Sequence, residues 1–131
     1  TSSLAAIFPL PFQSFYAVSK AGLNSFSDAV GIELRPFGVE TCALLLNDVR
    51  TDFTDNRRKT PAGDEVYGGK MEASERRGMA PEAVAAALMR LLRRRHLPPH
   101  KIVGTGNELL GFLYRALPAR TLLWLLGKIY G

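Results

Sequence analysis

The chain has 131 residues, of which 47% are hydrophobic and 22% are charged, and its formal net charge is +5. This length and balance are typical of one ordinary soluble domain with a buried core. The single cysteine, Cys42, excludes an intrachain disulfide framework and fits a reducing, cytoplasmic compartment, where we expect it to be a small core residue on a strand.

The first residues of the chain have the character of the end of a β-strand. Residues 1–7 read as the end of a buried strand that passes into a loop with Pro9 and Pro11, because proline disrupts both helices and strand ladders. The sequence has no initiator Met and no signal-peptide pattern. We therefore expect a C-terminal piece of a longer chain, in which residues 1–131 form a single partial domain.

A long helix is predicted from about Phe15 to Leu34, where apolar residues recur at helical spacing, and Pro36 follows it. Residues 39–46 are too apolar for a strand with one wet face, which is typical of a parallel strand covered by helices on both sides. A helix, a turn and an apolar strand form one leg of a doubly wound sheet. The predicted fold class is α/β, as the C-terminal portion of a doubly wound parallel-sheet domain.

Tyr16 and Lys20 lie four residues apart in this helix, so we expect their side chains on one face. A phenol has a pKa of about 10, and a cation within about 4–6 Å lowers the pKa of a phenol. Ser3, upstream, adds a hydroxyl that can hydrogen-bond a substrate oxygen. The three residues predict a device that moves a proton on and off the oxygen of an alcohol or carbonyl compound. On spacing alone, a solvated lysine beside a half-buried tyrosine fits equally well.

Residues 47–95 are interpreted from their composition and their position after the predicted strand. The strand end before Asn47 is expected at the same sheet edge as Ser3, where doubly wound folds bind ligands. Residues from about 52 to 77 are polar and contain several glycines, which predicts a long mobile connection, typical of a functional lid or a disordered segment, with one short helix near 67–76. Pro81 opens a helix that ends near Arg95.

Two basic clusters, at residues 57–59 and 93–95, carry much of the net charge. Such clusters can attract nucleic acid, anionic lipid or a phosphorylated cofactor, but a short run is more often a solvated face. The second cluster also complements the dipole at the end of its helix. We expect no nucleic-acid partner. We also expect no metal site, because His96 and His100 lack a third ligand at suitable spacing.

The C-terminal part begins with a short strand at 101–103 and the sequence Gly104-Thr105-Gly106. This imitates a dinucleotide fingerprint, but the third glycine is missing, so we reject it as the cofactor site. Two amphipathic helices are predicted over about 107–130, with a break at Pro118 and an apolar run far below the ~20 residues that span a bilayer. They would cover the core, pair with another subunit, or make peripheral contact with a membrane surface.

Four stretches, Thr1–Ala6, Pro9–Phe12, Tyr16–Leu23 and Glu33–Val39, closely resemble the second half of a short-chain dehydrogenase/reductase. The resemblance is strongest over residues 1–53, and in the family the region equivalent to about 52–77 covers the substrate. It implies a Rossmann-type fold and an oxidoreductase that interconverts a small-molecule alcohol and carbonyl, with NAD or NADP supplying the hydride chemistry. Members of this family are commonly oligomers through the helix that bears the tyrosine, so a homo-oligomer is expected.

The resemblance also implies roles for the candidate catalytic residues. Ser3 would hold the substrate oxygen, Tyr16 would be the acid/base, and Lys20 would lower the pKa of the phenol and hydrogen-bond the nicotinamide ribose. Tyr16 and Lys20 thus count among the cofactor contacts as well. The cofactor's phosphate-binding glycine loop follows the family's first strand and is not in this sequence, so the 131 residues alone are expected to be inactive.

The loop after residue 46 departs from the family pattern. Members carry Pro-Gly there, followed by Val or Ile and then Thr, around the nicotinamide. This chain has Leu46 and Asn47 in place of Pro-Gly and keeps Val49 and Thr51. Asn tolerates positive φ better than most residues but adds a side chain. The resemblance implies cofactor contacts at Asn47, Val49 and Thr51. The altered pair also leaves open a non-catalytic oligomerisation or membrane-surface module that retains the fold.

Overall fold

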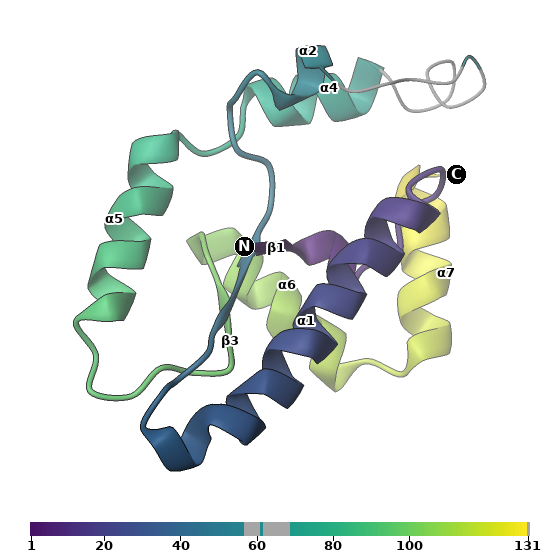
Figure 1. Ribbon diagram of the computed structural model, residues 1–131. Helices are drawn as coiled ribbons and strands as arrows, with labels where there is room; N and C mark the ends of the chain where they lie inside the picture. The colour runs from purple at the N-terminus through teal and green to yellow at the C-terminus, as the bar shows by residue number, and fades with distance from the viewer. Residues whose placement is uncertain (57–60, 62–68, 131) are drawn as a thin grey trace.

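The centre of the fold is a three-stranded parallel sheet, seen in a computed structural model that describes residues 1–56, 61 and 69–130 (Figure 1). The strands are β1 (Ser2–Ser3), β2 (Ala43–Leu46) and β3 (His100–Ile102), in the order β1-β2-β3. In this register Ser2 lies beside Leu45, and Leu45 lies beside Ile102. The parallel sheet with helices around it confirms the predicted α/β class.

Helices and short 3-10 turns make up most of the remaining described chain. They are η1 (Leu4–Ala6), α1 (Ser14–Leu34), η2 (Arg35–Phe37), α2 (Phe53–Asn56), α4 (Gly69–Arg76), α5 (Pro81–Leu92), α6 (Thr105–Ala116) and α7 (Ala119–Tyr130). The long helix, the helix from Pro81 and the two C-terminal helices match the sequence expectation to within a few residues. Residues 57–60 and 62–68, which include the first basic cluster and part of the connection predicted over about 52–77, lie outside the described residues.

β2 is apolar on both faces, and this places the core in two layers. Alternate side chains of a strand point to opposite faces, so Ala43 and Leu45 enter one cluster and Leu44 enters the other. The first cluster adds Leu4, Phe8 and Leu122, so η1 and α7 cover that face; the second adds Leu91 and Val103, so α5 covers the other. Two covered faces explain why the sequence of β2 shows no polar alternation.

Side-chain hydrogen bonds fasten α1 to the sheet. The Ser2 hydroxyl donates to the Lys20 carbonyl over 3.3 Å, and the Thr41 hydroxyl donates to the Ser27 carbonyl over 2.9 Å. A Cβ on Gly31 would collide with the Thr41 side chain, so the helix and the segment before β2 approach closely. Together these contacts position the first turns of α1, where the candidate catalytic residues lie, over β1.

Two strands are shorter than their sequences suggest. The residues predicted to end a strand over 1–7 continue the strand only through Ser3, because the Ser3 hydroxyl accepts from the Ala5 amide and turns the chain into η1. Pairing over 39–46 begins only at Ala43, after Gly38 ends η2 at a φ of +73°. Glycine adopts that left-handed conformation without the steric cost of a side chain.

Candidate active site

Ser3 stands at the carboxyl end of β1, half-buried. Its Oγ accepts a hydrogen bond of 3.1 Å from the Ala5 amide and so caps η1. A hydroxyl that accepts one bond still has its own O–H to donate. The side chain is therefore held in place while its proton remains available for a ligand oxygen.

Tyr16 and Lys20 lie on the same side of α1, as the four-residue spacing predicts. The Lys20 Nζ is 5.7 Å from the centroid of the Tyr16 ring, and it donates to the Thr1 carbonyl over 3.2 Å. Both side chains are half-buried. The structure thus brings the ammonium, the phenol ring and the start of β1 together. Among the described residues, no hydrogen bond joins Ser3 directly to Tyr16.

Phe53, in α2, lies against the candidate tyrosine. The two ring centroids are 6.4 Å apart and the rings are tilted by 44°. α2 itself starts where the Thr51 hydroxyl accepts from the Phe53 amide over 3.3 Å. The segment after β2 therefore reaches the phenol, a contact that no local sequence pattern indicates.

The residues expected to contact the cofactor follow β2 and are held by the other end of the chain. Asn47 Nδ2 donates to Asn107 Oδ1 over 3.2 Å, and Asn107 Nδ2 donates to the Val103 carbonyl over 2.9 Å. Val49 pairs with Met79 in a short parallel bridge. The ends of β2 and β3 are thus tied through one amide side chain of α6, which sequence reasoning missed because Asn47 and Asn107 are 60 residues apart.

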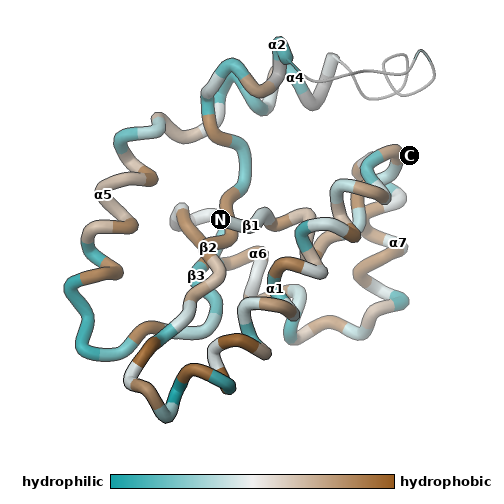
Figure 2. The backbone as a smooth tube through the Cα atoms, viewed as in Figure 1, coloured by the Kyte–Doolittle hydropathy of each residue, from teal (hydrophilic) through white to brown (hydrophobic). Residues whose placement is uncertain are grey.

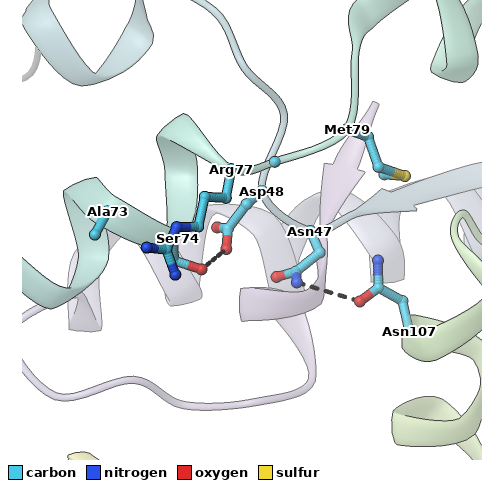
Figure 3. Close-up of a pocket in the computed structure, with 8 residues that line it drawn as sticks. Asn47, Asp48, Ala73, Ser74, Arg77, Met79 and Asn107 are labelled. Carbon is cyan, nitrogen blue, oxygen red and sulfur yellow. Dashed lines mark hydrogen bonds between the residues drawn. The ribbon is translucent and has the colours of Figure 1, made fainter.

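A cavity of about 530 Å³ opens beside this loop (Figure 3). Its lining is mixed, with a carboxylate, a guanidinium and two amides among the side chains. The residues that line it are Asn47, Asp48, Ala73, Ser74, Arg77, Gly78, Met79 and Asn107. The Ser74 hydroxyl donates to the Asp48 carboxylate, which joins α4 to the end of β2. The cavity lies between the carboxyl ends of the strands, α4 and α6, where doubly wound sheets bind ligands.

Two glycines allow segments beside the cavity to pack closely against each other. A Cβ on Gly78 would lie 2.6 Å from the carbonyl oxygen of Asp48, so only glycine lets these backbone segments approach. Gly104 has a φ of +101°, and a Cβ there would lie 2.8 Å from Asn107 Nδ2. Gly104 therefore permits the tight turn that leads into α6, and this turn brings Asn107 close to the end of β3.

The two histidines lie within hydrogen-bonding distance of carboxylates. His96 Nδ1 is 3.0 Å from Glu40, and His100 Nε2 is 3.0 Å from Asp28. The hydrogen bond with His96, followed by one from the Leu97 amide, lowers the pKa of Glu40 below its usual value. Within the part of the chain that the structure describes, no cluster of three or more metal-ligating residues is found.

Comparisons with known proteins agree on one family. The family model described as "short chain dehydrogenase" matches residues 1–62. The 3-ketodihydrosphingosine reductase of Bacteroides thetaiotaomicron is 30% identical over 112 residues, covering 79% of this chain and 42% of the relative. The NADPH-dependent 1-acyldihydroxyacetone phosphate reductase of Saccharomyces cerevisiae is 28% identical over 136 residues, covering 98% and 44%.

A solved structure shows the same fold. A short-chain dehydrogenase from Streptomyces avermitilis superposes with a TM-score of 0.68 at 23% identity, covering 98% of this chain and 48% of that one. The chain belongs to the short-chain dehydrogenase/reductase family, and its fold is the Rossmann-type α/β fold. It spans about half the length of the relatives it matches.

Proposed function

We propose that this chain supplies the catalytic residues of an NAD(P)-dependent oxidoreductase that interconverts an alcohol and a carbonyl compound. The observation that carries the proposal is the position of Lys20 Nζ, 5.7 Å from the Tyr16 ring centroid and hydrogen-bonded to the carbonyl of Thr1, which precedes the strand that ends at Ser3. An ammonium group beside a phenol favours transfer of its proton. The similarity to reductases supports the same chemistry.

Each residue has one task in this proposal. The Ser3 hydroxyl donates to the substrate oxygen, since the bond that it accepts from the Ala5 amide leaves its own proton free. Tyr16 then gives its phenolic proton to the carbonyl oxygen during reduction, or takes the proton from the alcohol during oxidation. Lys20 stabilises the negative charge that the phenol acquires when its proton leaves. A bound nicotinamide would supply the hydride.

The residues present fit a nicotinamide nucleotide. A lysine ammonium has three donors, and the described structure uses one of those of Lys20, for the Thr1 carbonyl. The remaining donors suit the ribose hydroxyls. Asn47, Val49 and Thr51 would line the same site, on a loop held by Asn107 and by the bridge to Met79. Because the yeast relative is named NADPH-dependent, NADPH is the cofactor to test first.

The cavity beside this loop is the proposed site for the part of the substrate away from the reacting carbon, because Ser3, Tyr16 and Lys20 are not among the residues that line it. Its amides, carboxylate and guanidinium suit a small-molecule ketone or alcohol that carries further polar groups. α4 forms one wall, so the segment over about 52–77 that was expected to cover the substrate does contribute to the proposed site. Two relatives are named as reductases, which favours carbonyl reduction as the direction to assay.

The test replaces Tyr16 by Phe in the complete natural protein, assayed for NADPH oxidation with a panel of small ketones. General acid catalysis contributes about 10²–10⁴-fold, so kcat should fall by at least about 10²-fold while cofactor affinity changes little. Tyr114→Phe is the matched control, because Tyr114 contacts Phe8 through its ring and lies outside the proposed site. Turnover retained in Tyr16→Phe would refute the assignment.

A non-catalytic oligomerisation module is the second candidate, favoured by an uncovered apolar stripe on α1. Phe15 is 91% exposed, Val18 69% and Phe26 65%, and no atom lies within 4 Å of a Cβ built on Gly22. Such a stripe suits contact with a second copy of the chain. Sedimentation equilibrium of the wild type and of Phe26→Glu tests this. A dimer that Phe26→Glu dissociates, together with no turnover by the wild type, would favour this module over the enzyme.

A further inference from the structure

α6 and α7 carry several large apolar side chains that are exposed, together with exposed basic side chains. We define the α6–α7 surface by its exposed apolar residues Leu109, Phe112, Leu123 and Trp124 and its exposed basic residues Arg115, Arg120 and Lys128. Phe112 is 66% exposed and Trp124 is 61% exposed. Large apolar side chains gathered in this way on a surface indicate an interaction site.

Both helices rest on the same face of the sheet. Leu122 of α7 lies in the cluster with Leu45, and a Cβ on Gly111 of α6 would collide with Ile102, which packs on that cluster. Figure 2 shows apolar residues along much of α7. The inner sides of α6 and α7 are therefore occupied, and their outer sides face away from the sheet.

The α6–α7 surface is positively charged. Arg115, Arg120 and Lys128 are exposed, and Glu108, the one acidic residue among residues 105–131 of the sequence, is paired with Lys101. Arg120, Trp124 and Lys128 follow at intervals of four, so two cations flank the tryptophan along one side of α7. Trp between Arg and Lys, beside Phe and Leu, is the composition of a helix that lies in a bilayer interface.

We propose that the α6–α7 surface docks on an anionic lipid bilayer. The basic residues would attract the anionic headgroups, and Phe112, Leu123 and Trp124 would enter the boundary between headgroups and acyl chains. In the described residues no helix is long and apolar enough to cross a membrane, so the contact is with one leaflet. This proposal stands independently of the redox function.

A second copy of the chain fits this surface less well than a lipid surface does. A two-fold interface brings the same patch of both copies together, so Arg120 and Lys128 would face like charges. The α1 stripe of Phe15, Val18 and Phe26 has no such cations and suits a protein contact better. Charge therefore distinguishes the two exposed apolar surfaces.

The experiment is vesicle flotation of the complete natural protein with phosphatidylcholine vesicles that contain 0% or about 30% phosphatidylserine. We expect at least tenfold more bound protein with phosphatidylserine and loss of most binding at about 0.5 M salt, since salt screens exposed charges. Trp124 gives a direct readout when the emission of the wild type is compared with that of Trp124→Phe, because Trp124 is 61% exposed on this surface. Its emission should shift to shorter wavelength on binding and be quenched by brominated lipid, and Trp124→Phe should lack that signal.

Variants separate charge from apolar insertion. Arg120→Glu with Lys128→Glu should lower phosphatidylserine-dependent binding by at least tenfold, whereas the matched reversal Arg93→Glu with Arg94→Glu, outside the surface and with the same charge change, should not. Leu123→Asp should weaken binding, and Phe26→Asp on α1 should not. The charge variants alter exposed polar residues, so they test the proposal even if Leu123→Asp fails to fold.

Three results would overturn the proposal. One is equal flotation with and without phosphatidylserine. A second is equal loss of binding in the two charge-reversed pairs. The third is a Trp124 emission that shifts with protein concentration and not with vesicles, which would assign the surface to a second copy of the chain.

Discussion

Lys20 and Tyr16 meet beside the start of β1, where the lysine Nζ lies 5.7 Å from the tyrosine ring centroid and 3.2 Å from the Thr1 carbonyl oxygen. Two supports create this arrangement. The helix sets the spacing of the two side chains, and the Ser2 hydroxyl bonds the Lys20 carbonyl and so fixes the helix against the strand. The ammonium is thereby held beside Thr1, two residues before the candidate Ser3.

Lys20→Met should impair both turnover and cofactor binding. The change removes the charge that stabilises the phenolate and the donors proposed for the ribose, so we expect kcat to fall by about 10²-fold and the cofactor Kd to rise by at least about tenfold. Steady-state kinetics and fluorescence titration with NADPH measure the two effects. Ser19→Ala is the control, since it removes an exposed hydroxyl on the same helix that bonds only the Tyr16 carbonyl. A Lys20→Met protein with wild-type cofactor affinity would contradict the ribose contact.

Asn107 should act as a positioning residue for the loop after β2. Asn107→Ala removes the acceptor for Asn47 and the donor for Val103, so we expect the KM for cofactor to rise several-fold more than kcat falls. Asn107→Asp keeps an acceptor for Asn47 and should recover part of the KM. An equal effect of both variants on KM would show that the Asn47 contact has no role.

A double-mutant cycle with Asn47→Ala and Asn107→Ala measures the same contact by stability. A neutral side-chain hydrogen bond contributes about 0.5–1.5 kcal/mol, so the two changes should be non-additive by an amount in that range. Urea unfolding of the four proteins gives the coupling free energy. Strict additivity would mean that the bond between Asn47 and Asn107 does not form in solution.

The sequence predicted the elements better than the site. The periodicity around Phe26 placed α1, and the spacing of Tyr16 and Lys20 placed their side chains together, because both signals are local. Phe53 and Asn107 reach the site through contacts between distant segments, which single-sequence patterns do not encode. The early end of β1 was missed for another reason: a capping hydroxyl at Ser3 overrides the strand propensity of its neighbours.

Ionised Glu40 should stabilise the folded protein at neutral pH and lose this effect at acidic pH. Its pKa is lowered in the folded protein, first by the hydrogen bond with His96 and then by the Leu97 amide. A carboxyl with a lowered folded pKa contributes stability above its unfolded pKa and loses that contribution as pH falls through the folded pKa. Wild type should therefore have a higher Tm than Glu40→Gln near pH 6, and the Tm difference should shrink as the pH falls below the ordinary pKa of a glutamate carboxyl. Glu33→Gln, with the same charge change, is the control. A Tm difference independent of pH would contradict the linkage.

Cys42 should react slowly with alkylating reagents in the folded protein. Burial raises the pKa of its thiol, and only the thiolate is nucleophilic, so the reactive fraction near pH 8 is reduced. We expect iodoacetamide to modify Cys42 faster in urea than in the native state. Mass spectrometry of timed samples measures the rates. Equal rates in the two conditions would mean that the segment before β2 is open in solution.

Leu122 and Leu123 are neighbours on α7 with opposite environments, and they test whether this helix covers the core. Leu122 is 7% exposed in the cluster with Leu45, whereas Leu123 is 54% exposed on the α6–α7 surface. Removing a buried leucine side chain costs about 2–5 kcal/mol, while an exposed substitution usually changes stability by less than about 0.5 kcal/mol. Leu122→Ala should therefore lower the free energy of unfolding strongly and Leu123→Ala hardly at all, as measured by urea denaturation. Equal effects would mean that α7 does not pack on the sheet, and the lipid-facing orientation of its outer side would then lose its structural basis.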